Sequence, residues 1–419
     1  MEYGNLITGD TLLNFQRFTF SNQRLFLHKL FHLFDSSYGL QVPKQLYEIC
    51  DFPNTEIPRG VFLNGAQVQS YLENYASAND LNKIVRLNTK LEKAEKRLDG
   101  RDGWILSTKD NSGVSKKEEV DYLIISTGMY SRPNLPHYAG EENFEGKIMH
   151  SSEFTENAQA SGKHVVVIGS AKSAIDVVVD SSKVSKRSTL LYRNAHWSAP
   201  RKIAGLIPFQ YIFLSRFGQG LVSWYKGAWP GSPKSVHTAN AIFSPIMGAV
   251  FGIVEALFQF QLGYKGDYTP KDDIVKDFYG YANVLDNSFK KARESDSLSI
   301  EKGTIAALGK DSVTLTSGKI IPCDILVCST GYEKSYTYFD KDVVDALKIE
   351  NDGLYLYRHC LPPSVSNLAF IGSEVATISN IMTYGIMAEW LARTLSGKMK
   401  LPSKEIMTKE VEDMKEWKR

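Results

Sequence analysis

The stretch HVVVIGSAKSAIDVVVD, residues 164–180, constrains the fold more than any other part of the chain. It begins with a short apolar run that is typical of a strand buried on both faces. Gly169 ends this run, and an amphipathic segment with helical spacing follows. A second apolar run, STLLYRN at 188–194, predicts another strand beyond that helix. Strand, helix and strand in this order form a βαβ unit, so the sequence predicts an α/β protein with a parallel sheet.

The turn in the middle of this unit has the spacing of a dinucleotide-binding loop. In such a loop the first glycine makes the bend, the second lets the pyrophosphate approach, and the third lets the helix pack on the strand. Gly169, Ala171 and Ala174 hold these three places. The Cβ of Ala171 holds a phosphate further away, whereas alanine is small enough for the third place. The same pattern also occurs in α/β proteins that bind no nucleotide, and this interpretation stays open.

Several polar groups around the turn favour an anion. The N-terminus of a helix offers free N–H groups and the positive end of its dipole. We expect the hydroxyls of Ser170 and Ser173 and the ammonium of Lys172 to add to this site. The candidate cofactor-binding residues of this loop and the next strand are Gly169, Ser170, Ala171, Lys172, Ser173, Ala174 and Arg193.

Arg193 indicates which nicotinamide nucleotide the loop prefers. About 20 residues after the loop, an NAD site offers a carboxylate to the ribose, whereas an NADP site offers an arginine to the 2′-phosphate. The second strand ends at Arg193 and has no carboxylate there. Because guanidinium recognises phosphate with two parallel hydrogen bonds, we expect NADPH rather than NADH. The alternative is that Arg193 is an ordinary surface cation.

Composition and charge exclude several other classes. The 49 Lys and Arg residues nearly balance the 47 Asp and Glu residues, so nucleic acid is not an expected partner. The four cysteines form no CxxC pair, which indicates a reducing, cytoplasmic setting and disfavours a flavin disulfide reductase. The eight histidines show no metal-ligand spacing, so no metal site is expected.

An apolar segment at 203–263 complicates the picture of a soluble protein. Its core, AIFSPIMGAVFGIVEALFQFQLG at 241–263, approaches the length that spans a bilayer. Pro245, Glu255 and two glutamines interrupt it, and a charge in the bilayer is costly. We expect a buried helix. The alternatives are an element that touches an intracellular membrane from one side, with Trp224 and Trp229 beside it, and a membrane span.

Shorter patterns complete the expected secondary structure. The spacing of apolar residues predicts a helix at 66–80, and turn residues between alternating segments predict a β-meander at 83–127. A hairpin that turns at Ser317-Gly318 is expected within 312–332. The C-terminal part predicts a strand at 367–373 and a helix at 386–397, followed by a polar end.

Several motifs together resemble the flavin-containing monooxygenases, class B flavoproteins that use FAD and NADPH. FEGKIMHSSEF at 144–154 matches the family pattern F-x-G-x-x-x-H-x-x-x-(Y/F). IISTGMYSRPNLP and CDILVCSTGY resemble two strand exits of the family. LLYRNAHWSAPRK and YGLQVPKQLYEICDFPN resemble its plant and fungal branch. The resemblance covers residues 38–400.

The resemblance implies a fold with two dinucleotide-binding domains, in which the NADP domain is inserted into the FAD domain. Applied to this chain, it gives a divergent N-terminal segment at 1–37, a first part of the FAD domain at 38–154, an NADP domain at 155–325 and a second part of the FAD domain at 326–419. The apolar segment 203–263 lies within the NADP domain.

The family also implies an activity. NADPH reduces FAD, O2 adds to give a C4a-hydroperoxyflavin, and one oxygen atom passes to a small lipophilic nucleophile, as in N- or S-oxygenation. The implied FAD contacts are Thr127, Gly128, Thr330, Gly331 and the helix start at 372–385. Gln41 stands where animal members have a flavin-proximal asparagine, and it is the one candidate catalytic residue. His150 either orients the Pro-containing connector at 131–147, which lies between the domains, or is a structural histidine.

The chain departs from the family pattern at its N-terminal end. The family has a GxGxxG turn for the FAD pyrophosphate before the position of residue 38, but residues 1–37 contain only Gly4 and Gly9, which do not have this spacing. We therefore expect an incomplete FAD domain, which an incomplete gene, a true truncation or a repurposed relative would each explain. The alternative function is a truncated, catalytically inactive relative that binds NADPH. The sequence carries no signal of the oligomeric state.

Overall fold

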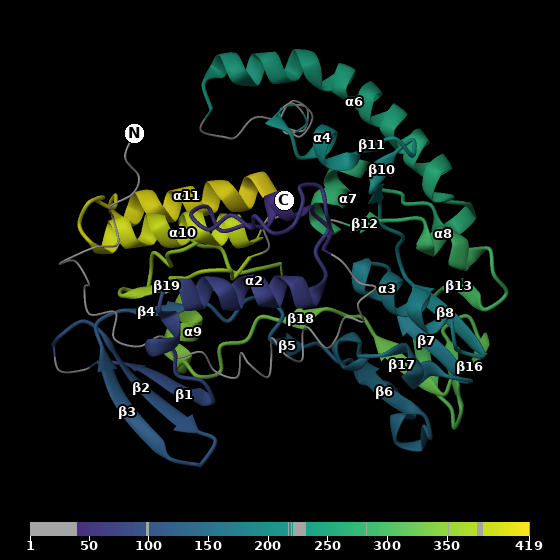
Figure 1. Cartoon of the computed structure of the whole chain (residues 1–419), viewed down its shortest axis with the longest axis horizontal. Coiled ribbons are helices and arrows are strands. Elements are labelled where there is room, and N and C mark those ends of the chain that lie inside the picture. Colours follow the sequence, from purple (N-terminus) through teal and green to yellow (C-terminus); the bar gives the residue numbers. More distant parts are fainter. Residues whose placement is uncertain are drawn as a thin grey trace.

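The computed structural model of the chain describes residues 40–97, 100–216, 218, 220, 232–281, 283–350, 352–374 and 380–418. The N-terminal segment 1–37, Trp224, Trp229 and residues 375–379 lie outside the described residues. Figure 1 shows a unit around a parallel sheet on one side, a unit with two long C-terminal helices on the other, and one long helix that arches above both.

A five-stranded parallel sheet forms the centre of the first unit. Its order is β13-β8-β7-β17-β6, and every neighbouring pair is parallel. The strands are β6 (Lys147–His150), β7 (His164–Ile168), β8 (Arg187–Tyr192), β13 (Leu298–Lys302) and β17 (Ile325–Cys328). Helix α3 (Lys172–Ser181) connects β7 to its neighbour β8. The predicted parallel βαβ unit and the α/β fold class are confirmed.

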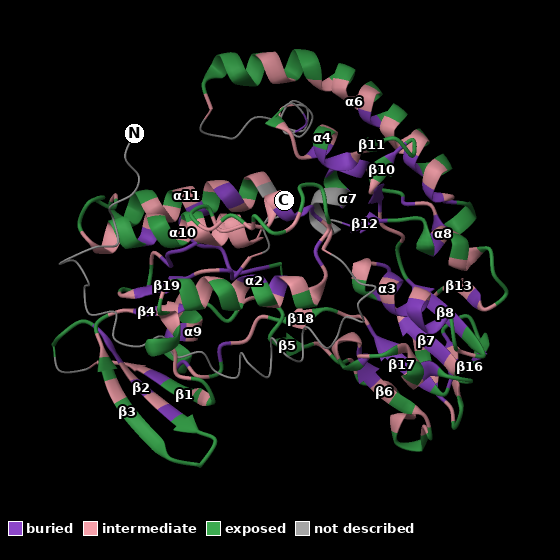
Figure 2. Cartoon of the chain, viewed as in Figure 1, coloured by how far each residue is buried: buried purple, intermediate pink, exposed green. Residues whose placement is uncertain are grey.

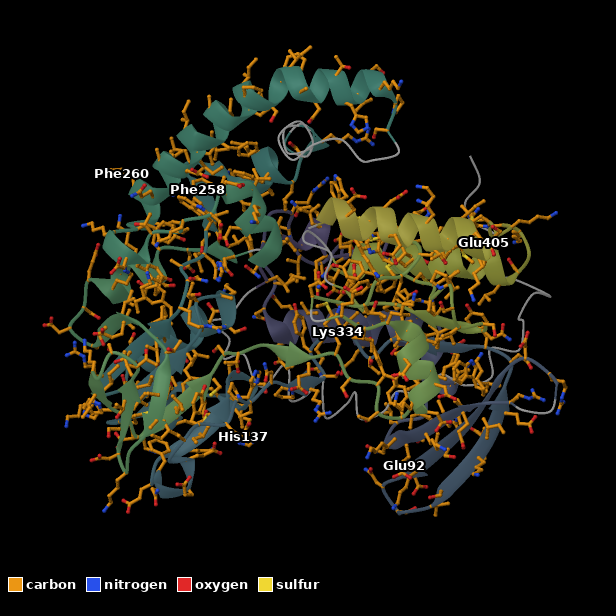
Figure 3. All side chains as sticks on the ribbon, turned by 180° about the vertical axis from the view of Figure 1, so that it is seen from behind. Glu92, His137, Phe258, Phe260, Lys334 and Glu405 are labelled. Carbon is orange, nitrogen blue, oxygen red and sulfur yellow. The ribbon has the colours of Figure 1, made fainter. Side chains whose placement is uncertain are left out.

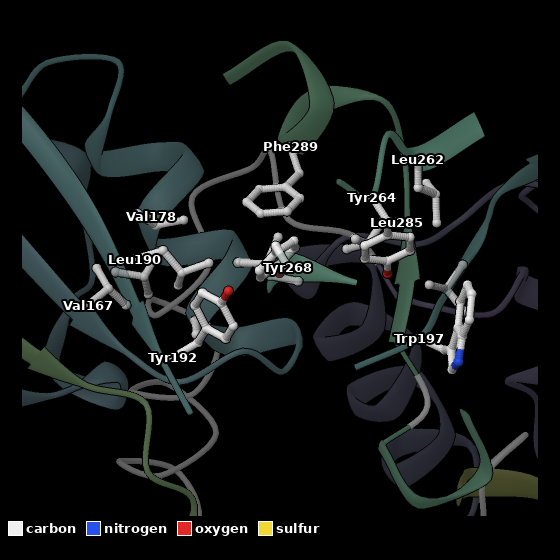
Figure 4. Packing of buried hydrophobic residues seen from close by; sticks show 14 of the residues in the cluster. Val167, Val178, Leu190, Tyr192, Trp197, Leu262, Tyr264, Tyr268, Leu285 and Phe289 are labelled. Carbon is white, nitrogen blue, oxygen red and sulfur yellow. The ribbon is translucent and has the colours of Figure 1, made fainter. Parts of the chain in front are cut away.

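The three central strands of this sheet, β7, β8 and β17, are buried on both faces, as their apolar runs predict. Val165 and Val167 of β7 point into one hydrophobic core together with Val178 of α3, whereas Val166 points into another. Figure 4 shows the first core, in which Val167 and Leu190 of the sheet meet Val178. The second core lies under a small antiparallel sheet of β14 (Ile305–Leu308), β15 (Ser312–Leu315) and β16 (Ile320–Pro322), which confirms the predicted hairpin.

The sheet also contains residues that lie outside the expected NADP domain, both before residue 155 and after residue 325. Strand β6 comes before residue 155, and β17 extends to Cys328. Around the sheet lie β9 (Ser198–Pro200), β10 (Lys202–Ile203), β11 (Ile207–Pro208), α4 (Phe209–Phe213), α7 (Ile274–Tyr281), β12 (Asn283–Leu285) and α8 (Ser288–Arg293). The domain boundaries themselves stay a prediction.

The second unit is built around an antiparallel meander and a short parallel pair. The meander of β1 (Thr89–Lys96), β2 (Trp104–Asp110) and β3 (Ser115–Val120) confirms the prediction for this region. Strand β4 (Leu123–Ile125) leaves the meander and pairs in parallel with β19 (Leu368–Phe370). The helices of this unit are α2 (Gly65–Ala78), α9 (Lys341–Leu347), α10 (Asn380–Leu395) and α11 (Lys404–Lys418).

Helix α11 is the polar C-terminal end that the sequence predicts, and it also carries a buried stripe. Val411 and Met414 of this helix are buried in one core with Leu391 of α10, and the two helices lie side by side in Figure 1. The tail is therefore an amphipathic helix with a narrow apolar stripe, which its many charged residues obscure.

Helix α6 (Lys234–Leu262) corrects the expectation of a buried helix in the apolar segment. By length and composition alone it could cross a membrane, yet most of its apolar residues are exposed. Figure 2 shows exposed and half-buried residues along most of its arch. Phe251, Phe258 and Leu262 are its only buried residues. One stripe packs on the protein, and the remaining apolar surface has no cover among the described residues.

Candidate dinucleotide and flavin site

The carboxyl ends of the parallel strands bring four predicted features to one edge of the sheet. Gly169 follows β7, Arg193 follows β8, Thr330-Gly331 follow β17, and His150 ends β6. The chain runs from β7 to β8 on one side, while β17 and β6 lie on the other side of β7. The end of β7 is therefore the topological switch point, where open α/β sheets bind their ligands.

Gly169 makes the bend that the sequence pattern requires. Its φ of +128° lies in a region that side chains other than glycine rarely adopt, and a Cβ here would lie 2.8 Å from the carbonyl oxygen of Ser329. Its N–H donates to the carbonyl oxygen of Leu191 at 2.9 Å. Ala174 packs against Gly169 from the first turn of α3. The turn is therefore held tightly between β8 and β17.

The N-terminus of α3 faces this turn, and no side chain caps it in the usual way. Ala171 is the N-cap residue. One donor is engaged, because the Lys172 N–H donates to Oδ1 of Asn283 at 2.9 Å. Asn283 is fully buried, and its Nδ2 has no hydrogen-bond partner in the described part of the chain. A buried amide donor thus lies next to the predicted phosphate site.

Two of the three polar side chains that were expected to add to the anion site make contacts within the protein instead. The Ser170 hydroxyl donates to the carbonyl oxygen of Asn194 at 2.6 Å, which joins the turn to the residues after β8. Ser173 is exposed. Lys172 forms an ion pair with Asp176 one turn along the helix. Burial raises the pKa of the Asp176 carboxyl, and the Lys172 charge opposes this effect.

Arg193 is the exposed cation of this edge. It follows directly after β8 and forms no hydrogen bond or ion pair with the described residues. Its charge acts on the Tyr138 phenol, which packs with Cys328 at the end of β17. A guanidinium held at a strand end beside a phosphate loop can bind a phosphate group without breaking an existing contact.

His150 of the F-x-G-x-x-x-H pattern joins the connector to β17. The Ser152 N–H donates to Nδ1 at 3.1 Å, so Nε2 carries the proton and donates to the carbonyl oxygen of Gly331 at 3.0 Å. The ring also packs edge-on against Tyr332, with 4.8 Å between the centroids. Burial lowers the pKa of His150, which keeps the ring neutral. These contacts join the end of β6 to the exit of β17.

The other residues of the pattern at 144–154 fix the position of the same segment through close contacts. A Cβ at Gly146 would lie 2.4 Å from the ring of Phe144 and 2.5 Å from the carbonyl oxygen of Asp324, so only glycine fits. Phe154 is buried in the core beside α3. Sequence reasoning found this pattern as a family signature, whereas its local function becomes clear only from these contacts.

The exit of β4 meets the exit of β17 at the junction of the two units. Strand β5 (Arg132–Pro133) pairs with β18 (Tyr332–Glu333), and the Asn134 N–H donates to the carbonyl oxygen of Gly331 at 3.0 Å. Thr330 donates its hydroxyl proton to the carbonyl oxygen of Asn134. The structure therefore brings the chain that follows Gly128 against the turn at Thr330-Gly331.

Both glycines of this junction border open space. Gly128 and Gly331 have φ values of +71° and +79°, and a Cβ at either would meet no atom within 4 Å. Thr127, beside Gly128, is exposed. The surface at these turns is therefore bare backbone, which a flat or phosphorylated ligand can approach closely.

Gln41 lies against the dinucleotide side of the junction. Its Oε1 accepts a hydrogen bond from the Val284 N–H at 2.7 Å. Val284 follows Asn283 in β12, so Gln41 supports the strand that contacts the start of α3. This oxygen is engaged in a backbone contact, and a flavin-proximal role for the amide stays a prediction.

Tyrosines that the sequence did not single out gather at the junction. The phenols of Tyr47, Tyr130 and Tyr384 interact electrostatically, and burial raises the pKa of each. The Tyr130 ring contacts Tyr332 edge-on at 5.2 Å. These phenols stay neutral at physiological pH. The described residues contain no cluster of acidic, histidine and cysteine side chains that could hold a metal ion.

The family model "Flavin-binding monooxygenase-like" matches residues 36–227 and 297–419, about three quarters of the chain. The probable flavin-containing monooxygenase 1 of Arabidopsis thaliana is 25% identical, covering 88% of this chain and 76% of its own length. The N-oxide-forming dimethylaniline monooxygenase 2 of Oryctolagus cuniculus is 25% identical over 86% of this chain. The chain spans 62% of the length of that relative.

Solved structures share the fold. A cyclohexanone monooxygenase from Rhodococcus sp. Phi1 bound to NADP+ superimposes with a TM-score of 0.63 at 17% identity, covering 87% of this chain and 77% of that one. The complex of OTEMO with FAD and NADP gives a TM-score of 0.58 at 16% identity, covering 80% of this chain and 71% of that one. At these identities the structures show the architecture of the chain.

The family match covers the pattern around His150, the turn at Gly169 and both strand exits of the junction. The chain therefore belongs to the flavin-binding monooxygenase-like family.

Proposed function

We propose that this protein is an FAD- and NADPH-dependent monooxygenase that transfers one oxygen atom of O2 to a small lipophilic nucleophile, by N- or S-oxygenation. The observation that carries this proposal is the exposed guanidinium of Arg193 beside the Gly169 turn, at the switch point of a parallel sheet. When bound, FAD supplies the chemistry that activates oxygen, and NADPH supplies the electrons.

The residues at the switch point fit NADPH. Apart from the Lys172 N–H, which Asn283 accepts, the N-terminus of α3 offers N–H groups to the pyrophosphate, and the buried Nδ2 of Asn283 is a further donor in need of an acceptor. Arg193 would hold the 2′-phosphate. Lys172 contributes less, because its ammonium is paired with Asp176.

The residues of the junction fit part of a flavin site. Gly128 and Gly331 present open backbone at two strand exits, and Thr127 is exposed beside them. The family description supports a flavin, and the OTEMO complex supports FAD. Of the helix start predicted at 372–385, residues 375–379 lie outside the described residues, and so does the segment 1–37, in which the family's FAD turn is missing.

The junction also suits a neutral substrate. His150 and the surrounding tyrosines are uncharged, so the described residues supply hydrogen bonds and apolar surface rather than a strong acid or base. The rabbit relative that forms N-oxides supports an amine as the nucleophile. Four free cysteines support a reducing, cytoplasmic setting. The family match does not favour the alternative of an inactive relative.

The first test of the proposal is turnover. Purified full-length protein supplied with FAD is expected to consume O2 with NADPH and to oxygenate dimethylaniline. The absence of both flavin binding and O2 uptake would contradict the proposed activity.

The second test concerns the 2′-phosphate. Arg193→Ala should raise the Kd of NADPH roughly 10- to 100-fold, because charge-assisted hydrogen bonds are worth about 1.5–3 kcal/mol. The Kd of NADH should hardly change. Arg187→Ala is the matched control, since Arg187 is an exposed arginine at the opposite end of the same strand. Equal losses for NADPH and NADH would contradict the assignment of Arg193.

A further inference from the structure

The outer face of α6 is one continuous apolar stripe. Its large residues are Ile242, Ile246, Ile253 and Phe260, which are 62%, 54%, 71% and 84% exposed. Steps of four, seven and seven residues return to the same side of a helix, so these side chains point in one direction. Exposed alanines at 249 and 256 fill the positions between them. No charged or polar side chain interrupts the stripe.

The opposite face holds α6 to the protein. Phe251, Phe258 and Leu262 are buried in the core of the sheet unit, and Oε1 of Glu255 accepts a hydrogen bond from the Ile274 N–H at 2.7 Å. Figure 3 shows Phe258 directed toward the protein and Phe260 away from it. A helix that crosses a bilayer needs apolar surface all round, whereas one face of the second half of this helix is buried against the protein. Its geometry therefore suits a helix that lies flat on an apolar surface rather than one that crosses a bilayer.

A neighbouring hairpin extends the apolar face. Gln261 holds the β10–β11 hairpin beside the end of the stripe, because its Nε2 donates to the carbonyl oxygen of Lys202 at 2.6 Å and its Oε1 accepts from the Ala204 N–H at 2.9 Å. Leu206 in the turn of this hairpin is 80% exposed. Exposed apolar patches of this extent on a soluble protein mark an interaction surface.

The charge of this region differs from that of the rest of the chain. Residues 201–266 contain six basic residues and one acidic residue, a net charge of +5, whereas the whole chain has +2 and the remainder therefore −3. Lys234 lies at the first end of α6, and Lys265 and Lys202 lie at the other; all three are exposed. Apolar residues flanked by basic ones bind the surface of anionic membranes.

We propose that the outer face of α6 and the turn of the β10–β11 hairpin form a docking surface for an anionic lipid bilayer, with α6 lying in the plane of the membrane. A second copy of the chain fits less well. Antiparallel pairing of two α6 helices would bring the Lys234 end of one copy next to the Lys202 and Lys265 end of the other, and like charges repel. An anionic bilayer offers acyl chains to the apolar stripe and negatively charged headgroups to the lysines at both ends.

Co-sedimentation of the full-length protein with vesicles tests this surface. We compare vesicles of phosphatidylcholine with vesicles that also contain about one third phosphatidylserine, at low and high ionic strength. The protein should bind the anionic vesicles at least about tenfold more tightly, and salt should weaken this preference.

Two sets of variants separate the apolar and the basic contributions. I253Q with F260Q should weaken binding to anionic vesicles about tenfold or more, because two exposed apolar side chains are lost. The matched control is I320Q with I406Q, two other exposed isoleucines away from α6. K202Q, K234Q and K265Q together should remove most of the preference for anionic lipid, whereas K90Q, K109Q and K117Q on the meander should not.

All four variants change exposed residues, so their thermal midpoints should equal that of the parent protein. A loss of vesicle binding would then not result from unfolding. Equal effects of the α6 variants and their controls would overturn the proposal, and so would failure of the parent protein to bind anionic vesicles. A concentration-dependent dimer that I253Q with F260Q abolishes, without vesicle binding, would assign the surface to a second copy instead. None of these outcomes depends on turnover or on NADPH binding.

Discussion

At the residue scale, Gly169 concentrates the steric constraints of the site. G169A would force a Cβ into a backbone conformation with φ of +128° and to 2.8 Å from the Ser329 carbonyl oxygen. We expect a loss of about 2–4 kcal/mol in the free energy of unfolding, since strain and a close contact add. Urea unfolding measures it. The control G162A also has positive φ, but its Cβ meets no atom within 4 Å, so it should cost only about 1 kcal/mol. Equal losses would show that the contact with Ser329 is unimportant.

His150 gives the protein a pH dependence with a defined sign. Burial lowers its pKa below the ordinary value of about 6.5. The unfolded chain therefore takes up a proton at higher pH than the folded one, so the stability that neutral His150 contributes is complete above about pH 6.5 and is lost as pH falls through the lower folded pKa. H150Q retains a donor for the Gly331 carbonyl and does not titrate, so its thermal midpoint should fall less between pH 7 and 5. Parallel pH profiles would contradict this assignment.

At the element scale, α2 begins with a capping box whose contribution can be measured. The Gln67 N–H donates to Oδ1 of Asn64 at 2.9 Å, and the Asn64 N–H donates to Oε1 of Gln67 at 3.0 Å. N64A should lower the free energy of unfolding by about 1 kcal/mol. N82A is the control, because Asn82 makes only an exposed side-chain contact with Ser77. A loss with N82A as large as that with N64A would show that the cap is unimportant.

Elements whose stabilising contacts are local were predictable from the sequence. The β7–α3–β8 unit, the meander and the hairpin at Ser317-Gly318 each carry their own apolar period and turn residues. Helix α11 was not predictable in the same way, because only Val411 and Met414 reveal its buried side among many charges. The apolar residues of α6 indicated burial, whereas the structure exposes most of them. Composition alone does not distinguish a buried helix from one with an exposed apolar face.

The candidate site was predictable in its glycines and Arg193 but not in its partners. The contacts of Gln41 with Val284 and of Lys172 with Asn283 join residues that are more than 100 positions apart. Likewise, the bond from His150 to Gly331 depends on how two units meet, which no local pattern encodes.

At the scale of the whole molecule, separate hydrophobic cores predict stepwise unfolding. The cores of the sheet unit and of the unit around β4 and β19 share no residues. Calorimetry should therefore show two transitions. NADP+ at 100 times its Kd should stabilise only the sheet unit, by about 2.7 kcal/mol, because the site lies at the end of β7. Equal shifts of both transitions, or a single transition, would contradict this division.

The structure of the NADP+ complex tests the central claim most directly. We predict that the pyrophosphate lies against the turn at Gly169 and the N-terminus of α3, and that the guanidinium of Arg193 contacts the 2′-phosphate at about 2.7–2.9 Å. A complex in which the nucleotide binds elsewhere, with Arg193 directed into solvent, would contradict the account.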